Sequence, residues 1–415
     1  MTLSSVPNIR TSVLIVLGCA IGMATNFATI FSTSMAAFIK PITSEFGWSR
    51  TEMISGYSAA LFALAISSSP IGLAIDRFSA RTILLLSIPA FGAAVASMAF
   101  IPDNLPIYIL LCICIGLFGS GCFNFVYISI LPRWFGKRLG LALGISVAGS
   151  GLGAAFVPPF AQHLIETFGW RNAYLVLGAT AVATAWPVAF LALRMPGTGP
   201  RLSLAQIAAS PADPSVLLRQ VLRTTLFWRL AACYFLLACM ANAHVIHLIP
   251  LLTDRGMSPR AAADYMTVFG ISVVMSRICG GYLLDLCDAG MLGSAVAMFG
   301  VLGVGILLTS SAPVQLVLAV ALIGMSVGAE GDVVSYILRR LFGVDVFGSL
   351  NGIMFTVILT GFLIGPMIMS LSFDNFGSYA PAQYTLLTGA MLAALGHFGV
   401  MRGRSVREPD QSVPS

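Results

Sequence analysis

The stretch VLIVLGCAIGMATNFATIFSTSMAAF, residues 13–38, contains no charged side chain. A helix of about 20 apolar residues crosses the hydrocarbon layer of a bilayer, which is roughly 30 Å thick. The stretch is too long for the apolar region of a signal peptide, and no convincing small-residue cleavage site follows it. We therefore predict that it is a retained first transmembrane helix.

The rest of the chain repeats this pattern. Of 415 residues, 58% are hydrophobic and only 9% are charged, whereas roughly 25% are charged in a soluble domain. Turn and charge clusters separate the apolar runs, so that helices are expected at residues 13–38, 51–74, 82–101, 106–131, 139–165, 172–194, 229–252, 262–284, 291–310, 314–338, 346–372 and 382–401. The sequence therefore predicts an all-α membrane protein with twelve transmembrane helices.

Basic residues predict the orientation in the membrane. If the N-terminus is cytoplasmic, sixteen of the 22 Lys and Arg residues lie on cytoplasmic segments and Arg277 lies within a span. The other five lie on the opposite side: Lys40, Arg50, Arg171, Arg255 and Arg260. This asymmetry satisfies the positive-inside rule with both termini in the cytoplasm. The formal charge of +6 therefore reflects topology, and we expect no nucleic-acid partner.

The chain divides into two related halves. One long polar connection, rich in proline and arginine, separates six predicted helices from six. We expect an N-terminal half at 1–194, a cytoplasmic linker at 195–228, a C-terminal half at 229–402 and a cytoplasmic tail at 403–415.

Residues recur between these halves at nearly fixed offsets. At 209 residues, Pro41, Glu45, Gly47, Ser49, Gly72 and Asp76 match Pro250, Asp254, Gly256, Ser258, Gly281 and Asp285. At 208 residues, Gly144, Gly153, Pro158, Phe168 and Gly169 match Gly352, Gly361, Pro366, Phe376 and Gly377. A parallel repeat of this kind predicts two halves related by a pseudo-two-fold axis along the membrane normal, with a solute site between them.

A loop between the second and third predicted helices carries a compact set of charges. It reads Gly72-Leu-Ala-Ile-Asp76-Arg77-Phe-Ser-Ala-Arg81 and resembles the cytoplasmic loop signature of the major facilitator superfamily. We expect Gly72 to permit close helix approach, and the charged residues, with Asp285 in the second half, to act as a gating latch. The alternative is a plain positive-inside anchor.

Further short motifs resemble a narrower group, the bacterial monocarboxylate porters and oxalate/formate antiporters. They are residues 46–50, 133–138, 149–153, 169–171, 254–258 and 339–343, reading FGWSR, RWFGKR, GSGLG, GWR, DRGMS and RRLFG. This resemblance implies a multi-pass protein of the bacterial inner membrane that carries small carboxylates by proton-linked or exchange transport. It also implies a protein that works as a monomer without a cofactor.

Arg277 is the main candidate for substrate binding. An ionisable side chain at bilayer depth costs about 2.5 to 3.5 kcal/mol on insertion scales, so it needs a function or a partner. Arg277 resembles the arginine that faces the central cavity in monocarboxylate porters, where its guanidinium could bind a carboxylate through two hydrogen bonds. The alternative is a structural ion pair. Animal members carry a nearby aspartate and a first-helix lysine, for which this chain has Val273 and Thr33.

Glu330 and Asp332 are the candidates for proton coupling, because they are the acidic residues predicted to lie well inside a span. Being two residues apart, they cannot share one face of a helix, so at most one is expected to face the cavity. A buried carboxyl group favours its protonated form. The alternatives are permanent neutralisation of Arg277 or contacts with cytoplasmic basic residues.

Weaker substrate-binding candidates are polar residues at helical spacing. His244 and His247 share a helix face and could relay protons or contact substrate, although packed, hydrogen-bonded histidines are the more common outcome. Asn124 and Tyr127 on the fourth helix, and Asn26 and Thr29 on the first, could bind a solute or stabilise helix packing. No cluster has the spacing of a metal site. The glycines of the eleventh predicted helix, Gly352, Gly361 and Gly365, indicate tight packing.

Together these features predict a secondary transporter of a small organic anion, with a monocarboxylate as the first choice of substrate. No P-loop is present to use ATP, so a proton or an exchanged anion would supply the energy. An alternative is a carrier of another organic solute, such as a vitamin or a drug-like compound. A membrane enzyme or non-transporting sensor is a remote alternative, because no catalytic constellation is present.

Overall fold

The computed structural model describes residues 9–131, 134–135, 139–191, 214–286, 288–342 and 347–397. Every regular element in these ranges is a helix. The first half contains α1 (Ile9–Ala24), η1 (Phe27–Thr33), α2 (Met35–Phe46), α3 (Arg50–Phe78), α4 (Ala80–Ser97), η2 (Met98–Phe100), α5 (Leu105–Ser120), α6 (Asn124–Ile128) and α7 (Leu139–Leu191). The second contains α10 (Thr225–Asp254), α11 (Pro259–Leu286), α12 (Ala289–Thr309), α13 (Pro313–Phe342), α14 (Phe347–Phe376) and α15 (Ala380–His397).

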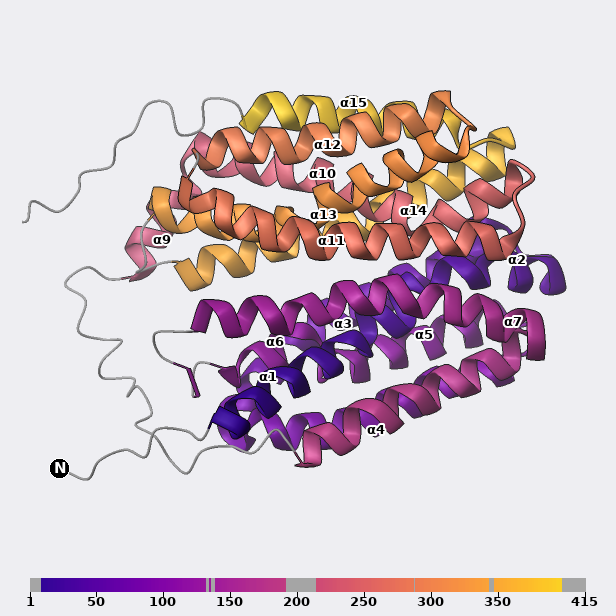
Figure 1. The fold of residues 1–415 in the computed structure, drawn as a ribbon, viewed down its shortest axis with the longest axis horizontal. Coiled ribbons are helices and arrows are strands. Elements are labelled where there is room, and N and C mark those ends of the chain that lie inside the picture. Colours follow the sequence, from indigo (N-terminus) through magenta and orange to yellow (C-terminus); the bar gives the residue numbers. More distant parts are fainter. Residues whose placement is uncertain are drawn as a thin grey trace, which may run out of the picture.

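The helices form two bundles side by side. Figure 1 shows the first half, coloured indigo to magenta, below the second, coloured pink to yellow. The described chain ends at Ile9 and His397, and helix α9 (Pro214–Leu222), lie at the same end of the molecule (Figure 1). We call the opposite end the distal end. Helix α9 lies within the predicted linker, and the described chain before it ends at Leu191.

Twelve crossings are accounted for by the described helices. Nine segments are long and apolar enough to span a membrane. One of them, Ala142–Leu191, contains two crossings joined at Gly169, where the backbone is not helical. Helices α3 and α15, which are not among the nine, supply two more. The predicted all-α, twelve-helix architecture is thus confirmed.

Two helices predicted to be continuous are interrupted. The first crossing changes to a π-helix at Phe27, where the Asn26 side chain accepts a hydrogen bond from the Ala28 backbone at 2.9 Å. The fourth is broken between α5 and α6, beside Gly121. A Cβ atom on Gly121 would lie 2.0 Å from the Ser87 Oγ atom, so the chain approaches α4 too closely for a larger residue. Hydropathy cannot reveal either interruption, because both lie within apolar runs.

The internal repeat is visible in the backbone. Within the described ranges, four glycines have positive φ angles: Gly47 (69°), Gly256 (87°), Gly169 (79°) and Gly377 (64°). They are two of the pairs expected from the repeat, and each makes a reversal at the distal end. Because positive φ strains residues with a Cβ atom, glycine is required at equivalent turns of both halves.

Candidate functional site

The two halves approach each other closely where α7 crosses α11. A Cβ atom on Gly151 would lie 2.4 Å from the Val274 Cγ2 atom, and one on Gly270 would lie 2.3 Å from the Ala155 backbone nitrogen. The Thr267 hydroxyl donates a hydrogen bond to the Ala155 carbonyl at 2.8 Å. Small residues therefore let these two backbones pack across the interface between the halves.

Arg277 lies on α11, three residues after Val274, and is partly buried. The neighbouring Ser276 hydroxyl donates a hydrogen bond to the Met325 carbonyl of α13 at 2.5 Å. This bond fixes α11 to its own half beside the arginine. Arg277 thus belongs to the helix that contacts the opposite half, as a residue of a central site must.

Three polar side chains of the first half meet near the same contact. The Asn26 Nδ2 atom donates to the Asn124 Oδ1 atom at 2.6 Å, and the Ser150 hydroxyl donates to the same oxygen at 3.2 Å. Ser150 directly precedes Gly151, the residue that packs on Val274. The structure therefore brings the predicted Asn26 and Asn124 together. Ser150, which we did not single out, joins them.

The other two first-half candidates make different contacts. Tyr127 is buried and packs its ring on Gly22, where a Cβ atom would lie 2.2 Å from the Tyr127 Cε1 atom. Among the described residues its hydroxyl has no hydrogen-bond partner. The Thr29 hydroxyl donates to the Asn26 carbonyl at 3.2 Å. Thr29 therefore supports the interrupted first crossing.

Glu330 is buried inside the second half, with 6% of its surface exposed. A Cβ atom on Gly328 would lie 2.5 Å from the Val273 carbonyl oxygen, so Gly328 faces α11. Glu330 is two residues, or about 200°, further round α13, so its side chain leaves the face of α13 that packs on Val273. Within the described chain its Oε1 atom has no hydrogen-bond partner. The side chain of Asp332 lies outside the described part of the structure.

His244 and His247 are both buried among α10, α14 and α15. The His244 Nδ1 atom lies 2.7 Å from the Met240 carbonyl, and its Nε2 atom lies 3.5 Å from the Gln383 side chain. The His247 ring lies 3.1 Å from the Pro366 carbonyl and 3.3 Å from the Tyr379 hydroxyl. These contacts favour the packed, hydrogen-bonded alternative over substrate contact.

The predicted gating residues lie at the end opposite the distal end. In this structure no described atom comes within 4 Å of a Cβ atom built on Gly72, so the expected close approach is not observed there. The Arg81 guanidinium donates to the carbonyls of Ala189 and Phe190, in its own half. The side chains of Asp76, Arg77 and Asp285 are not among those described.

Among the described residues, the ion pairs that join the halves lie at the distal end. Asp254, the last residue of α10, accepts hydrogen bonds from two nitrogens of Arg50, with Nη1 to Oδ2 at 2.7 Å and Nη2 to Oδ1 at 3.1 Å. The Lys40 Nζ atom lies 2.6 Å from the Asp254 Oδ1 atom. Both basic residues belong to the first half and Asp254 to the second. We call these three residues the distal ion cluster.

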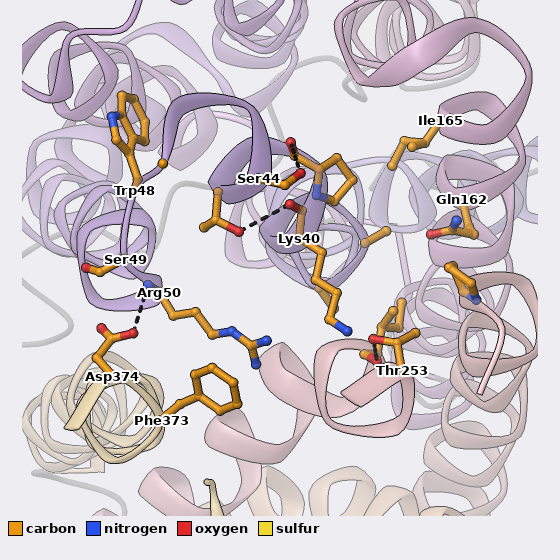
Figure 2. Close-up of a pocket in the computed structure, with 17 residues that line it drawn as sticks. Lys40, Ser44, Trp48, Ser49, Arg50, Gln162, Ile165, Thr253, Phe373 and Asp374 are labelled. Carbon is orange, nitrogen blue, oxygen red and sulfur yellow. Dashed lines mark hydrogen bonds between the residues drawn. The ribbon is translucent and has the colours of Figure 1, made fainter. Parts of the chain in front are cut away.

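Further contacts hold Arg50 in place. Its guanidinium carbon lies 3.5 Å from the centre of the Phe373 ring, and its side chain also bonds the Tyr379 hydroxyl. Asp374 accepts hydrogen bonds from the backbone nitrogens of Arg50 at 3.1 Å and Thr51 at 2.8 Å, at the start of α3 (Figure 2). All three partners belong to the second half, so Arg50 is fixed to it from several sides.

Sequence reasoning missed the distal ion cluster, although the repeat contained a signal. Glu45 and Asp254 are repeat equivalents. Glu45 pairs with Arg171 and accepts a 2.6 Å hydrogen bond from the Trp170 ring nitrogen, within the first half. Asp254 instead crosses to the other half. The repeat predicts that Glu45 and Asp254 lie at the same end of the molecule. Only the three-dimensional arrangement shows that Asp254 is the one that joins the two bundles.

The fold and this arrangement define a class: a multi-pass membrane protein with two six-helix halves and polar groups at their interface. Residues 20–330 match the profile of the Major Facilitator Superfamily. The chain belongs to this superfamily and is a transporter of that family.

Named relatives agree with this assignment. Human monocarboxylate transporter 11 is 29% identical over 357 residues, covering 81% of this chain and 71% of its own length. Rat monocarboxylate transporter 4 is 24% identical over 416 residues, covering 96% and 86%. These proteins are named as transporters, which agrees with the expectation that the chain is not an enzyme. The resemblance to monocarboxylate porters noted in the sequence is thereby confirmed.

Solved structures support the fold. A bacterial homologue of the human lysosomal transporter Spinster, in an inward-facing and unoccupied conformation, superposes with a TM-score of 0.73 at 16% identity. The alignment covers 95% of this chain and 98% of the other. A D-xylose-proton symporter gives a TM-score of 0.70 at 14% identity, covering 94% and 98%. At these identities the likeness concerns the fold alone.

Proposed function

We propose that this protein carries a small monocarboxylate across the membrane by alternating access, with Arg277 binding the carboxylate group. The observation that supports this most is the contact between Gly151 and Val274. It brings the helix of Arg277 against the helix of Ser150, whose hydroxyl belongs to the Asn26 and Asn124 group. A cation from one half and neutral polar groups from the other suit a small hydroxy or keto acid.

The chemistry of the two sides is complementary. A guanidinium offers two parallel N–H groups that match a carboxylate, whereas amide and hydroxyl groups can bind the rest of the solute. A site divided between the halves is also suited to alternating access, because rocking of one bundle against the other changes which side it opens to. The names of the relatives, monocarboxylate transporters of human and rat, agree with a carboxylate substrate.

The proposal also includes an orientation. The described chain ends and helix α9 lie at one end of the molecule, where the sequence concentrates its basic residues, so the positive-inside rule makes that end cytoplasmic. The distal end then faces outside, in a plasma membrane that corresponds to the inner membrane if the source is bacterial. The distal ion cluster joins the halves on the outer side, as an inward-facing state requires.

Uptake by the purified protein in liposomes tests this function. We expect saturable uptake of labelled lactate or pyruvate, competition by other small monocarboxylates and none by their amides. Saturable uptake of a neutral vitamin or drug-like compound, with no effect of monocarboxylates, would instead favour the alternative carrier function. Absence of uptake across both panels would contradict transport of either class.

Proton coupling through Glu330 is a separate part of the proposal. Glu330 is buried without a described hydrogen-bond partner for Oε1, and a carboxyl group in such a place prefers to be protonated. We expect Glu330→Gln to remove pH-driven accumulation of lactate while retaining exchange of lactate for lactate, because the amide mimics the protonated acid but cannot release a proton. Both rates can be measured in the same liposomes, with an imposed pH gradient or with internal lactate.

The control for this variant is Asp264→Asn, the same change of carboxyl to amide at an exposed position of α11. It should leave the ratio of accumulation to exchange unchanged. Accumulation by Glu330→Gln at the parent rate would contradict the assignment of Glu330 and leave Asp332 or anion exchange to supply the coupling.

A further inference from the structure

A cavity of about 720 Å³ lies at the distal end, between the two halves. Its charged lining residues are Lys40, Arg50 and Asp374. Asp374 already accepts two backbone hydrogen bonds from the start of α3, so its charge is directed at that helix terminus. Figure 2 shows the side chains of Lys40 and Arg50 extending into the space above Phe373 and Thr253. The cavity is therefore large enough for a small organic anion and has two cations in its wall.

The Asp254 carboxylate binds these two cations as the carboxylate of a ligand would. Arg50 binds its two oxygens with two nitrogens, and Lys40 adds a third contact to Oδ1. A planar carboxylate held by an arginine fork and a lysine is also how a free carboxylate would be recognised. Lys40 and Arg50 line the cavity, and 37% of the Lys40 side chain and 25% of the Asp254 side chain are exposed.

We propose that the distal ion cluster is a binding site for the carboxylate of an incoming anion, and that Asp254 is a tethered substitute which the anion displaces. This inference rests on the proposed function, because it takes the same substrate class. When a monocarboxylate binds Lys40 and Arg50, the ion pairs to the second half are replaced by contacts to the anion. The halves can then separate at the distal end without leaving two cations unpaired.

Displacement of Asp254 by an anion couples anion binding to the opening of the distal end. An anion that binds only when Asp254 has left shifts the population toward the state with an open distal end. A tethered group competes with an effective concentration on the order of millimolar or more. The anion should therefore act at millimolar concentrations. A neutral solute cannot replace Asp254 and should have no such effect.

The other distal contacts are compatible with opening. When Asp374 leaves α3, the first turn keeps a capping box of its own, in which Ser49 Oγ accepts from the Glu52 nitrogen at 3.1 Å and Glu52 accepts from the Ser49 nitrogen at 2.8 Å. The helix start thus remains hydrogen-bonded in both states. The two cations of the distal ion cluster, of which Arg50 is buried, lose Asp254 when the end opens, and an anion replaces it.

A cysteine substituted for Ser58, beneath the distal ion cluster, can report the opening of the distal end. Ser58 on α3 is 8% exposed, and its hydroxyl donates to the Leu363 carbonyl of the other half at 3.4 Å. In the variant Ser58→Cys, labelling by a membrane-impermeant maleimide added outside cells should accelerate several-fold with millimolar external acetate. Acetamide, which has the same shape without the charge, should leave the rate unchanged. Cells carrying the parent chain correct for labelling of native cysteines.

Variants in the Ser58→Cys background separate the contributions. Asp254→Asn should label fast without acetate, Lys40→Gln should lose the acetate response, and Lys40→Arg should keep it. The matched control is Glu45→Gln, which breaks an ion pair with Arg171 within the first half and should respond as the unmodified background does. An acetate response equal to that of acetamide, or slow labelling of Asp254→Asn, would overturn the inference.

Failure of this inference and failure of the proposed function give different results. Labelling requires no transport, so an acetate response without uptake of any monocarboxylate would support the distal site and contradict the function. Lactate uptake with labelling indifferent to acetate would support the function and contradict the distal site.

Discussion

Arg277→Lys is expected to reduce kcat/KM for lactate uptake by about ten- to a hundredfold. A charged hydrogen bond contributes about 1.5–3 kcal/mol, and lysine keeps the charge but cannot form the two parallel bonds of a guanidinium. Each 1.4 kcal/mol of lost transition-state binding corresponds to about a factor of ten in rate. The measurement is the initial rate of labelled lactate uptake into liposomes as a function of lactate concentration.

A matched control lies on the same helix. Arg260, in the first turn of α11, is exposed at the distal end, and Arg260→Lys should retain the parent kinetics. Unimpaired uptake by Arg277→Lys would contradict the carboxylate clamp and indicate that the arginine has a structural role. A reduced amount of folded protein is separated from a kinetic defect by normalising each rate to the monodisperse protein recovered from the liposomes.

Gly365→Val is expected to destabilise the second half by about 3 kcal/mol, at the upper end of the cost of overpacking a core. A Cβ atom on Gly365 would lie 2.1 Å from the Cys239 carbonyl oxygen of α10. That neighbour is backbone, which cannot rotate away, so the two helices must separate. Thermal unfolding in detergent, followed by loss of the monodisperse peak in size-exclusion chromatography, measures the effect.

Gly352→Val is the control for this prediction. Gly352 lies on the same helix, and a Cβ atom there would meet no described atom within 4 Å. Its valine variant should unfold within a few degrees of the parent protein. Equal destabilisation by both substitutions would show that the cost comes from helix propensity or insertion and not from the contact between α10 and α14.

The fold could be predicted from the sequence because its main determinants are local or periodic. Uncharged runs such as residues 13–38 specify membrane helices, and the repeat relates the turns at Gly47 and Gly256. The expected tight packing is confirmed at Gly361 and Gly365, where Cβ atoms would lie 2.7 and 2.1 Å from backbone oxygens of α10. It is wrong at Gly352, where a Cβ atom would meet no described atom within 4 Å. These features depend on composition and spacing, which can be read from the sequence itself.

The site was predictable only in part. Periodicity identifies a polar residue within a span but not what it faces, so Asn26 and Asn124 looked much like His244 and His247. In the structure, Asn26 of the first crossing bonds Asn124 of the fourth, whereas His244 and His247 are enclosed by packing contacts. Contacts between the halves, such as Arg50 with Asp254, join residues 204 positions apart, and no local pattern encodes them.

The short distal turns also affect how the molecule meets its surroundings. Connections there comprise no more than four residues, as at 47–49, 101–104, 255–258, 310–312 and 377–379, and α7 reverses at Gly169 alone. Such turns offer proteases no extended segment to cleave and antibodies little surface to bind. At the four reversals that contain Gly47, Gly169, Gly256 or Gly377, an inserted epitope tag would interrupt a turn that depends on glycine. With the distal end on the outer side, as proposed, solutes would be the main molecules that contact this face.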